Sequence, residues 1–354
     1  MRDLPGAADL RRFRIICELT AAVTFLLIVV GGVVRVSESG LGCGPAGSGT
    51  EGWPLCGGQV IPLIGDLNRI VEFTHRVLAG IVVVLIGMLA LRAYRGLRQL
   101  SWPLRGSLLA GVLVLVQAGL GGLTVEHNLE DELVAAHLCL AMLLLALLLW
   151  LAVKARVEEG AEVAGPAPRG EPEAAARADA PRSLRPFAGA GAVLLLCAIV
   201  AGGYVAGTEE EGAENGAANG AHLACGEGID AFPGCLDGRV LPFGESRLTD
   251  IQLTHRVSVY AATLAILLLV GVALRRGLRS RLLWVASSLL LLQLLLGALN
   301  VWLGEHPTLI VAHLTVATLL WSAVLLIAYR LAFAPEPAGA RLRPPHAEAS
   351  TVAA

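Results

Sequence analysis

The sequence predicts an all-α polytopic membrane protein of eight transmembrane helices, arranged as two pseudo-symmetric four-helix bundles. Three observations carry this prediction: the composition, eight long apolar segments, and an internal repeat. Of the 354 residues, 55% are hydrophobic and only 16% are charged, and the mean hydropathy is +0.69. A soluble domain would carry about 25% charged residues. The formal net charge of −2 gives no reason to expect a nucleic-acid partner.

A helix needs about 20 apolar residues to cross the hydrocarbon core of a bilayer. Continuous Leu, Val and Ala runs of about this length favour helices over the alternating segments of a membrane barrel. The expected spans are 13–35, 70–92, 104–125, 132–153, 186–207, 249–274, 281–303 and 307–330.

Arginines predict the orientation, because cytoplasmic loops are enriched in Lys and Arg. They are clustered before the first span, around the second-to-third and sixth-to-seventh turns, and in the tail, while the intervening loops are poor in basic residues. We therefore expect both termini in the cytoplasm and the cysteine-bearing loops outside a bacterial-type plasma membrane.

Four segments make up the predicted domain organisation. The N-terminal half covers 13–153 and the C-terminal half covers 186–330. Residues 154–185 are rich in Ala, Pro, Glu and Arg with little to bury, so they predict a flexible cytoplasmic linker. Residues 331–354 are of similar character and predict a disordered cytoplasmic tail.

The two halves repeat one another. VEFTHRV at 71–77 matches IQLTHRV at 251–257, and the stretch 117–138, which ends in VAAHL, matches 293–314, which ends in IVAHL. Each half has an even number of spans, so the repeats share one orientation and predict an axis along the membrane normal.

Each half contributes two histidines near the outer ends of its second and fourth spans. Ionisable side chains at membrane depth are costly and usually mark a function. A single such histidine could serve only as an interhelical hydrogen-bonding group, but four at matched positions favour an internal cofactor site. Two histidines suit haem better than a bare zinc ion, which needs more ligands. The four are His75, His137, His255 and His313.

Small residues flank the fourth-span histidines and would leave room for a flat macrocycle, although they also serve close helix packing. These are Ala136 and Ala141 in one half and Ala312 and Ala317 in the other. Arg76 and Arg256 directly follow the second-span histidines. They are candidate partners of haem propionates, and snorkelling to the headgroups is an equal alternative.

One difference between the halves suggests chemistry. Glu72 lies three residues before His75 on the same helix face, and Gln252 takes its place beside His255. A partly buried carboxylate there could transfer protons or stabilise a cation. The alternative is a carboxylate that only pairs with Arg76 or reaches the surface. We expect the first half to react and the second to hold a cofactor or electron relay.

Two cysteine pairs lie in the large outer loops, an oxidising location in which a disulfide within each loop is expected. A structural disulfide and a redox-active thiol pair are equally compatible with the sequence. The pairs are Cys43 with Cys56 and Cys225 with Cys235.

Together these residues resemble the haem A synthase family. The resemblance rests on VRVSESGLGCG and WPLCGGQVIP within 34–61, VEFTHR at 71–76, HNLEDELVAAHL at 127–138, LTHR at 253–256 and VAHL at 311–314. These motifs fall in both halves and leave only the linker and tail outside. Two features depart from the family pattern. The stretch before Cys225 is long and acidic, and it leaves the conformation of that loop open. The 13-residue separation of Cys43 and Cys56 is loose for a tight redox pair.

The resemblance implies oxidation of the C8 methyl of haem O to a formyl group, giving haem A for terminal oxidases, through a hydroxymethyl stage. By that likeness His75 and His137 would hold the substrate haem O, and His255 and His313 would be axial ligands of a haem b (iron) cofactor. Glu72 would be the catalytic acid, and the two cysteine pairs would be loop disulfides. Implied partners are haem O synthase and a membrane electron acceptor, with a homo-oligomer left open.

Two other functions remain open at this point. A non-catalytic di-haem electron-transfer protein would also need four histidines, but the Glu72 and Gln252 difference argues against two equivalent sites. A transporter with duplicated halves would place its polar site near the bilayer middle. Here the polar residues cluster toward the outer side.

Overall fold

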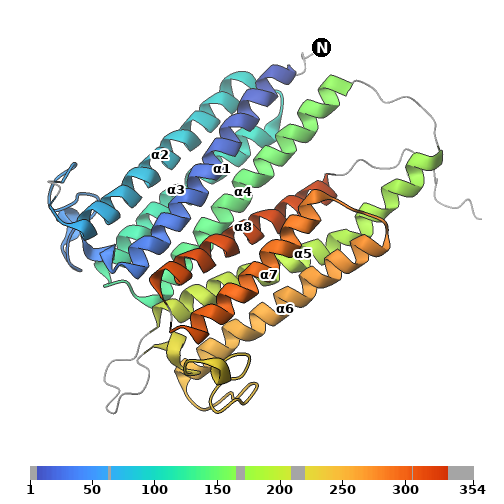
Figure 1. Cartoon of the computed structure of the whole chain (residues 1–354). Coiled ribbons are helices and arrows are strands. Elements are labelled where there is room, and N and C mark those ends of the chain that lie inside the picture. Colours follow the sequence, from blue (N-terminus) through green and yellow to red (C-terminus); the bar gives the residue numbers. More distant parts are fainter. Residues whose placement is uncertain (1–5, 63–64, 165–171, 209–219, 305, 334–354) are drawn as a thin grey trace, which may run out of the picture.

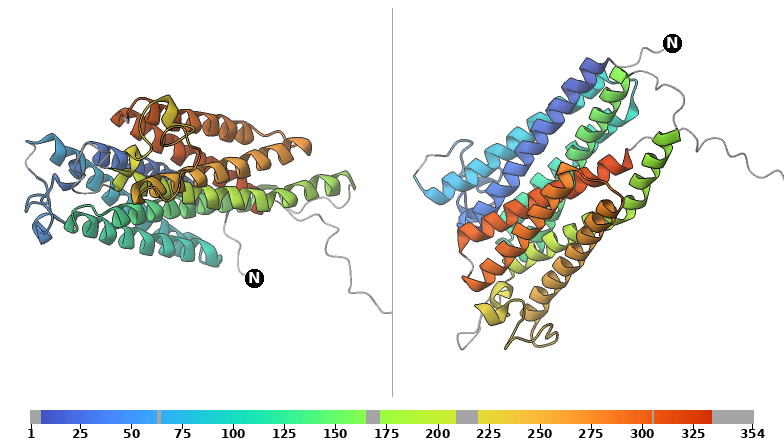
Figure 2. Two further views of the ribbon diagram at one scale, coloured as in Figure 1. Left: turned by 90° about the horizontal axis from the view of Figure 1, so that it is seen from below. Right: turned by 45° about the vertical axis from the view of Figure 1, so that its right-hand side comes forward.

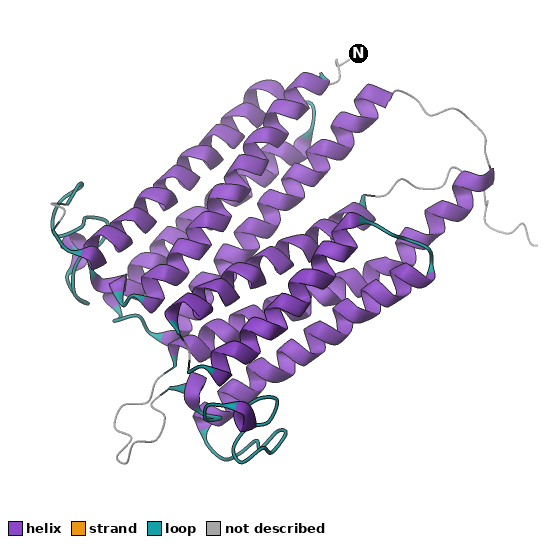
Figure 3. Cartoon of the chain, in the orientation of Figure 1, coloured by secondary structure: helices purple, strands orange, loops and turns teal. Residues whose placement is uncertain are grey.

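The structure is a computed structural model that describes residues 6–62, 65–164, 172–208, 220–304 and 306–333. In these residues it is built from helices and loops, without a β-strand (Figure 3). Eight helices are long and apolar enough to cross a membrane, which confirms the predicted all-α class with eight spans. They are α1 Ala7–Val36, α2 Leu67–Gly96, α3 Ser101–Glu126, α4 Asp131–Ala164, α5 Pro172–Gly207, α6 Arg247–Arg275, α7 Arg281–Trp302 and α8 Pro307–Ala332. The pseudo-symmetry of two four-helix bundles stays a prediction.

Local signals set where several helices begin. Asp66, Ser246 and Ser280 each accept a hydrogen bond from a backbone N–H in the first turn of α2, α6 and α7. Pro307 opens α8, where its missing N–H costs nothing. The candidate site residues near these helix ends therefore have fixed positions along their helices.

The helices contact one another within each half and also between the two halves. Contacts join α1 to α2 and α4, and α3 to α2 and α4; in the other half they join α5 to α6 and α8, and α7 to α8. Figures 1 and 2 show the two groups lying against each other through α1, α4, α5 and α8. Buried side chains of both groups belong to one continuous apolar core.

Two matched contacts bring the halves together at glycines. A Cβ atom on Gly32 of α1 would lie 2.7 Å from Leu314 Cδ2 of α8, and one on Gly203 of α5 would lie 2.8 Å from Leu138 Cδ2 of α4. Each leucine directly follows a fourth-span histidine. Each half therefore contributes one glycine that allows a leucine of the other half to pack closely against its helix.

The first helical group continues beyond its predicted spans. The sequence predicts a linker from residue 154, whereas α4 runs to Ala164. Its residues there are largely Ala, Glu, Lys and Arg, which are strong helix formers. Glu159 accepts from Arg14 Nε at 2.7 Å and Glu158 accepts from Trp102 Nε1 at 3.0 Å, which ties this extension to α1 and α3.

The second group likewise begins early, since α5 starts at Pro172 inside the predicted linker. Residues 165–171, the acidic stretch 209–219 and residues 334–354 of the predicted tail lie outside the described residues.

The disulfide-bearing loops and the arginine-rich turns lie at opposite ends of the helices. The loop between α1 and α2 and the loop between α5 and α6 share one end, and the N-terminal end of α1 is at the other (Figure 1). The α2–α3 and α6–α7 turns, which carry the arginine clusters, join the helices at that second end. Which end faces the cytoplasm stays a prediction from the arginine distribution.

The first loop meets α2 through Gly42, at the closest backbone approach in this region. A Cβ atom there would lie 2.5 Å from the carbonyl carbon of Asn68 and 2.8 Å from the backbone nitrogen of Arg69. Only a residue without a side chain lets the loop lie this close to the first turn of α2.

Gly42→Ala is expected to lower the free energy of unfolding in detergent by about 1–3 kcal/mol, because the clash is with backbone that cannot rotate away. Gly65→Ala is the matched control, since a Cβ atom there meets nothing within 4 Å. Denaturant unfolding followed by tryptophan fluorescence measures both. Equal stabilities for the two variants would contradict this packing.

Candidate functional site

Each of the four predicted histidines faces a glycine of the helix before its own. The first-half pairs join α1 to α2 and α3 to α4, and the second-half pairs join α5 to α6 and α7 to α8. Distances from a Cβ atom built on the glycine to histidine Cε1 are 3.2 Å for Gly31–His75, 3.1 Å for Gly121–His137, 2.8 Å for Gly202–His255 and 3.2 Å for Gly297–His313. The imidazoles therefore occupy space that any other residue would fill.

From the sequence alone we do not predict that these glycines belong to the site. We predict space for a macrocycle at alanines on the histidine's own helix, whereas the structure has the small residues on the neighbouring helix. A signal was present, because Gly-Gly pairs occur at 31–32, 121–122 and 202–203, and the fourth site reads Gly-Ala at 297–298. In three of the helices the second member of the pair receives another side chain: Leu314, Trp53 or Leu138.

The structure also brings the histidines of each half near enough for their charged forms to repel one another, His75 with His137 and His255 with His313. This placement agrees with the predicted pairing within each half. Their roles as ligands stay predictions.

The ring nitrogens show how these side chains could hold iron. In His255, Nδ1 lies 3.0 Å from the carbonyl oxygen of Ala198, so an N–H there donates and leaves Nε2 as the free electron pair. In His75 the matched backbone partner is Leu27. The buried Nδ1 atoms of His137 and His313 have no hydrogen-bond partner among the described residues.

Glutamines at matched positions support the fourth-span histidines. Gln117 Nε2 donates to the carbonyl oxygen of His137 at 2.9 Å, and Gln293 Nε2 lies 2.9 Å from His313 Nε2. Because Nε2 is the ring nitrogen that would bind iron, His313 must give up the contact with Gln293 to act as a ligand through it. These contacts were not predicted. They connect α3 to α4 and α7 to α8 at the level of the histidines.

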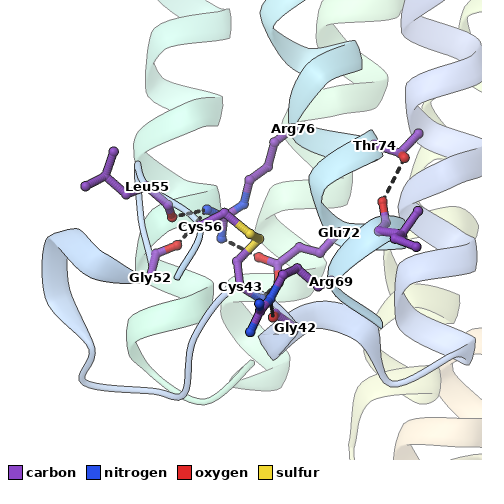
Figure 4. The surroundings of a disulfide bond; sticks show 10 residues. Gly42, Cys43, Gly52, Leu55, Cys56, Arg69, Glu72, Thr74 and Arg76 are labelled. Atoms are coloured by element: carbon purple, nitrogen blue, oxygen red, sulfur yellow. Dashed lines mark hydrogen bonds and ion pairs between the residues drawn. A yellow bond between two sulfur atoms is a disulfide. The ribbon is translucent and has the colours of Figure 1, made fainter. Parts of the chain in front are cut away.

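Glu72 lies at the boundary between α2 and the first loop, where it is buried with 4% of its surface exposed. Its Oε2 accepts from the backbone N–H of Cys43 at 2.6 Å, and its Oε1 pairs with Arg76 (Figure 4). The structure therefore realises the pairing with Arg76 that the sequence left open as an alternative. A carboxylate with two such donors is held in one orientation.

Arg76 fastens the first loop to α2. Its Nη1 donates to the carbonyl oxygens of Gly52 and Leu55 at 2.6 and 2.8 Å, while Nη2 reaches Glu72. Figure 4 shows this guanidinium between the disulfide loop and the carboxylate. We name these contacts of Glu72 and Arg76 the loop clamp. Snorkelling is not the geometry observed, and a contact with a propionate stays a prediction.

In the second half, Arg256 binds the loop in a similar way, but Gln252 stands where the first half has Glu72. Arg256 donates to the carbonyl oxygens of Ala231, at 2.9 Å, and Gly234. Gln252 instead donates through Nε2 to the carbonyl oxygen of His222 at 2.8 Å. The Nη2 atom of Arg256 and the Oε1 atom of Gln252 are buried without a partner among the described residues. Replacing Glu by Gln thus changes a hydrogen-bond acceptor into a donor and leaves a buried guanidinium without a counter-charge.

Both predicted disulfides are present, Cys43–Cys56 and Cys225–Cys235. Each lies in the loop held by the arginine of its half. Whether they also exchange electrons is not decided by this placement, so both readings of the cysteines stay open.

No group of three or more His, Cys, Asp or Glu side chains that could hold a metal ion occurs in the part of the chain that the structure describes. A zinc-type centre built from these residues is therefore not formed. Paired histidines facing glycines fit a flat iron macrocycle with two axial ligands better.

Arg76→Gln is expected to speed hydrogen exchange of the amides between Cys43 and Gly57 by about 10- to 100-fold, because hydrogen bonds to charged groups contribute about 1.5–3 kcal/mol. Arg95→Gln, at the exposed far end of α2, is the control. Exchange mass spectrometry of these peptides measures the effect. Unchanged exchange in Arg76→Gln would mean that the clamp does not hold the loop.

Comparison with known proteins agrees with the resemblance. The COX15-CtaA family model, described as cytochrome oxidase assembly protein, matches residues 66–325. Among similar proteins, the haem A synthase of Shouchella clausii is 27% identical over 274 residues, covering 77% of this chain and 80% of the relative. That of Alkalihalophilus pseudofirmus is 30% identical over 152 residues, covering 43% and 49%.

A third relative, the haem A synthase of Halalkalibacterium halodurans, is 29% identical over 136 residues, which is 38% of this chain and 44% of the relative. The chain thus matches about half of the length of two of these relatives and most of the other. The family match includes all four histidines, Glu72 and Arg76, while the first cysteine pair precedes it. Because that match covers well over half of its length, the chain belongs to the COX15-CtaA family of cytochrome oxidase assembly proteins.

Proposed function

We propose that this protein is a haem A synthase that oxidises the C8 methyl of haem O to a formyl group, supplying haem A to terminal oxidases. The observation that carries the proposal is the set of four glycine-facing histidines, two in each half. Family membership and relatives named haem A synthase support it. With water as oxygen donor, the conversion of a methyl to a formyl group releases four electrons and four protons, so a membrane electron acceptor is required.

The two histidine pairs would take different haems. In this proposal His75 and His137 hold the substrate haem O, and His255 and His313 are the axial ligands of haem b. The hydrogen bond from His255 Nδ1 to Ala198 supports a role of His255 as an iron ligand, because it leaves Nε2 free for a metal. A bound haem b would supply one-electron redox chemistry beside the reacting half.

Glu72 would be the reacting acid of the first half. Its pairing with Arg76 and Cys43 fixes the carboxylate near the outer ends of the helices. A fixed anion there can stabilise positive charge on the oxidised methyl carbon or accept a proton from the water that traps it. Gln252 cannot take this part in the second half, which supports an unreactive cofactor site there.

The arrangement in the membrane follows from the same proposal. Duplicated halves related by an axis along the membrane normal would place both haem sites near the disulfide-bearing loops. With the arginine clusters in the cytoplasm, haem O would be oxidised near the outer face of the plasma membrane. Haem O synthase would be the protein that supplies the substrate.

A di-haem electron-transfer protein is the alternative that shares most of these features. The difference between Glu72 in the first half and Gln252 at the matched position of the second half favours the enzyme. Two stoichiometric haem b groups in the purified protein, without conversion of haem O, would favour the alternative.

Glu72→Gln is expected to reduce conversion of haem O to haem A by about 100-fold or more, since positioned acids and bases contribute about that much. Glu51→Gln, an exposed carboxylate of the same loop, is the control. Haems extracted from cells that make haem O are separated by chromatography. Absence of haem A with the wild type would refute the synthase assignment, and full conversion by Glu72→Gln would refute the role of Glu72 alone.

Gly202→Ala is expected to lower haem b occupancy of the purified protein several-fold, because the added methyl would lie 2.8 Å from His255 Cε1 and overpacking costs about 1–3 kcal/mol. Gly189→Ala on the same helix meets nothing within 4 Å and is the control. The pyridine haemochrome spectrum measures occupancy. Equal haem content in both variants would show that the glycine is not needed for the site.

A further inference from the structure

A hollow lies at the end of the molecule opposite the disulfide loops, and no histidine lines it. It has a volume of about 550 Å³ and is lined by residues of α1, α4 and α8, so it opens where the two halves meet. We name it the interhalf groove. Its walls are apolar over most of their length, with Phe25, Leu149 and Leu326 among them.

The groove has the depth of one leaflet. On α8 its lining runs from Leu319 to Arg330. At about 1.5 Å per residue this is about 16 Å. Half of a bilayer core of about 30 Å is about 15 Å. Leu319 and Val157 are 39% and 42% exposed, so the walls can be reached from the surrounding hydrocarbon.

Charged side chains gather only at the arginine-rich end of the groove. Arg156 Nη2 pairs with Glu18 at 2.7 Å, which leaves that pair neutral. Arg330 is exposed and has no ion pair or hydrogen bond from its side chain within the described residues. The arginine-rich end of the groove therefore carries the unpaired positive charge of Arg330, and the guanidinium of Arg156 lines the same end.

The interior offers little to a polar ligand. Ser322 is the one uncharged polar residue of the lining, and its hydroxyl already donates to the carbonyl oxygen of Thr318 at 2.8 Å. Water needs two to four polar partners to occupy a cavity. An apolar chain is thus the occupant that fits the walls, and an anionic group is the one that fits the arginine-rich end.

From this combination we infer that the interhalf groove is a binding site for one anionic phospholipid of the leaflet at the arginine-rich end. An acyl chain fills the space between α1, α4 and α8, and the phosphate of the headgroup binds Arg330 with Arg156 beside it. The lipid completes the packing between the two halves below the histidine sites.

The test uses the full-length protein, delipidated in mild detergent and titrated separately with dioleoyl phosphatidylglycerol and dioleoyl phosphatidylcholine. Native mass spectrometry counts the bound lipids. We expect one phosphatidylglycerol to bind more tightly than phosphatidylcholine. Arg330→Gln should weaken phosphatidylglycerol binding about five-fold, the value of one interfacial basic residue, and leave phosphatidylcholine binding unchanged.

Two further variants separate the groove from general surface charge. Arg276→Gln removes an exposed arginine at the same end of α6, outside the groove, and should have no such effect. Ala22→Phe places a ring in the groove and should abolish the tight site for both lipids. Because Arg330 is exposed, its variant remains informative even if Ala22→Phe does not fold.

The inference is overturned if the wild type binds the two lipids equally, or if Arg276→Gln weakens phosphatidylglycerol as much as Arg330→Gln does. It is also overturned if folded Ala22→Phe retains the tight site. A neutral isoprenoid quinone bound in the groove, displaced by neither lipid, would likewise contradict it.

Discussion

The close approach of a glycine to each histidine is the contact on which the site depends. Four imidazoles lie against Gly31, Gly121, Gly202 and Gly297, each on the helix preceding their own. This geometry fixes the distances between α1 and α2 and between α3 and α4 in the first half. In the second half it fixes the distances between α5 and α6 and between α7 and α8. In a membrane, close packing of small residues replaces the hydrophobic drive for helix association. The residues that bring the helices together are therefore also the ones that make room for the four imidazoles.

The arginines next to the second-helix histidines link this helical frame to the disulfide-bearing loops. Arg76 and Arg256 hold backbone carbonyls of loops that each contain a disulfide. In the first half Glu72 completes the arrangement with an acceptor, whereas Gln252 supplies a donor to a different carbonyl. The single Glu-to-Gln difference therefore changes both the charge beside the arginine and the way in which the loop is held. In the proposed function, this difference is the reason why the two histidine sites have unequal chemistry.

Much of this could be predicted from the sequence, because membrane spans, cysteine pairs and repeated motifs are strong signals. Spans agree with the helices within a few residues at most ends. The region after residue 153 is the exception, since its charged helix formers extend α4 and dock on Arg14 and Trp102. The partners of Arg76 could not be predicted, because loop carbonyls carry no sequence signature. The glycines were visible as repeated pairs, but their pairing with histidines depends on interhelical register, which the sequence of one chain does not state.

In the proposed function, each half binds one haem through its own two histidines, and the two haems differ. Haem extraction and chromatography of purified His75→Ala and His255→Ala, from cells that make haem O, separate the two sites. His255→Ala should lose haem b and keep haem O at the first site, while His75→Ala should lose haem O and keep haem b. Loss of both haems from either folded variant, or loss of the same haem from both, would rule out one independent haem site in each half.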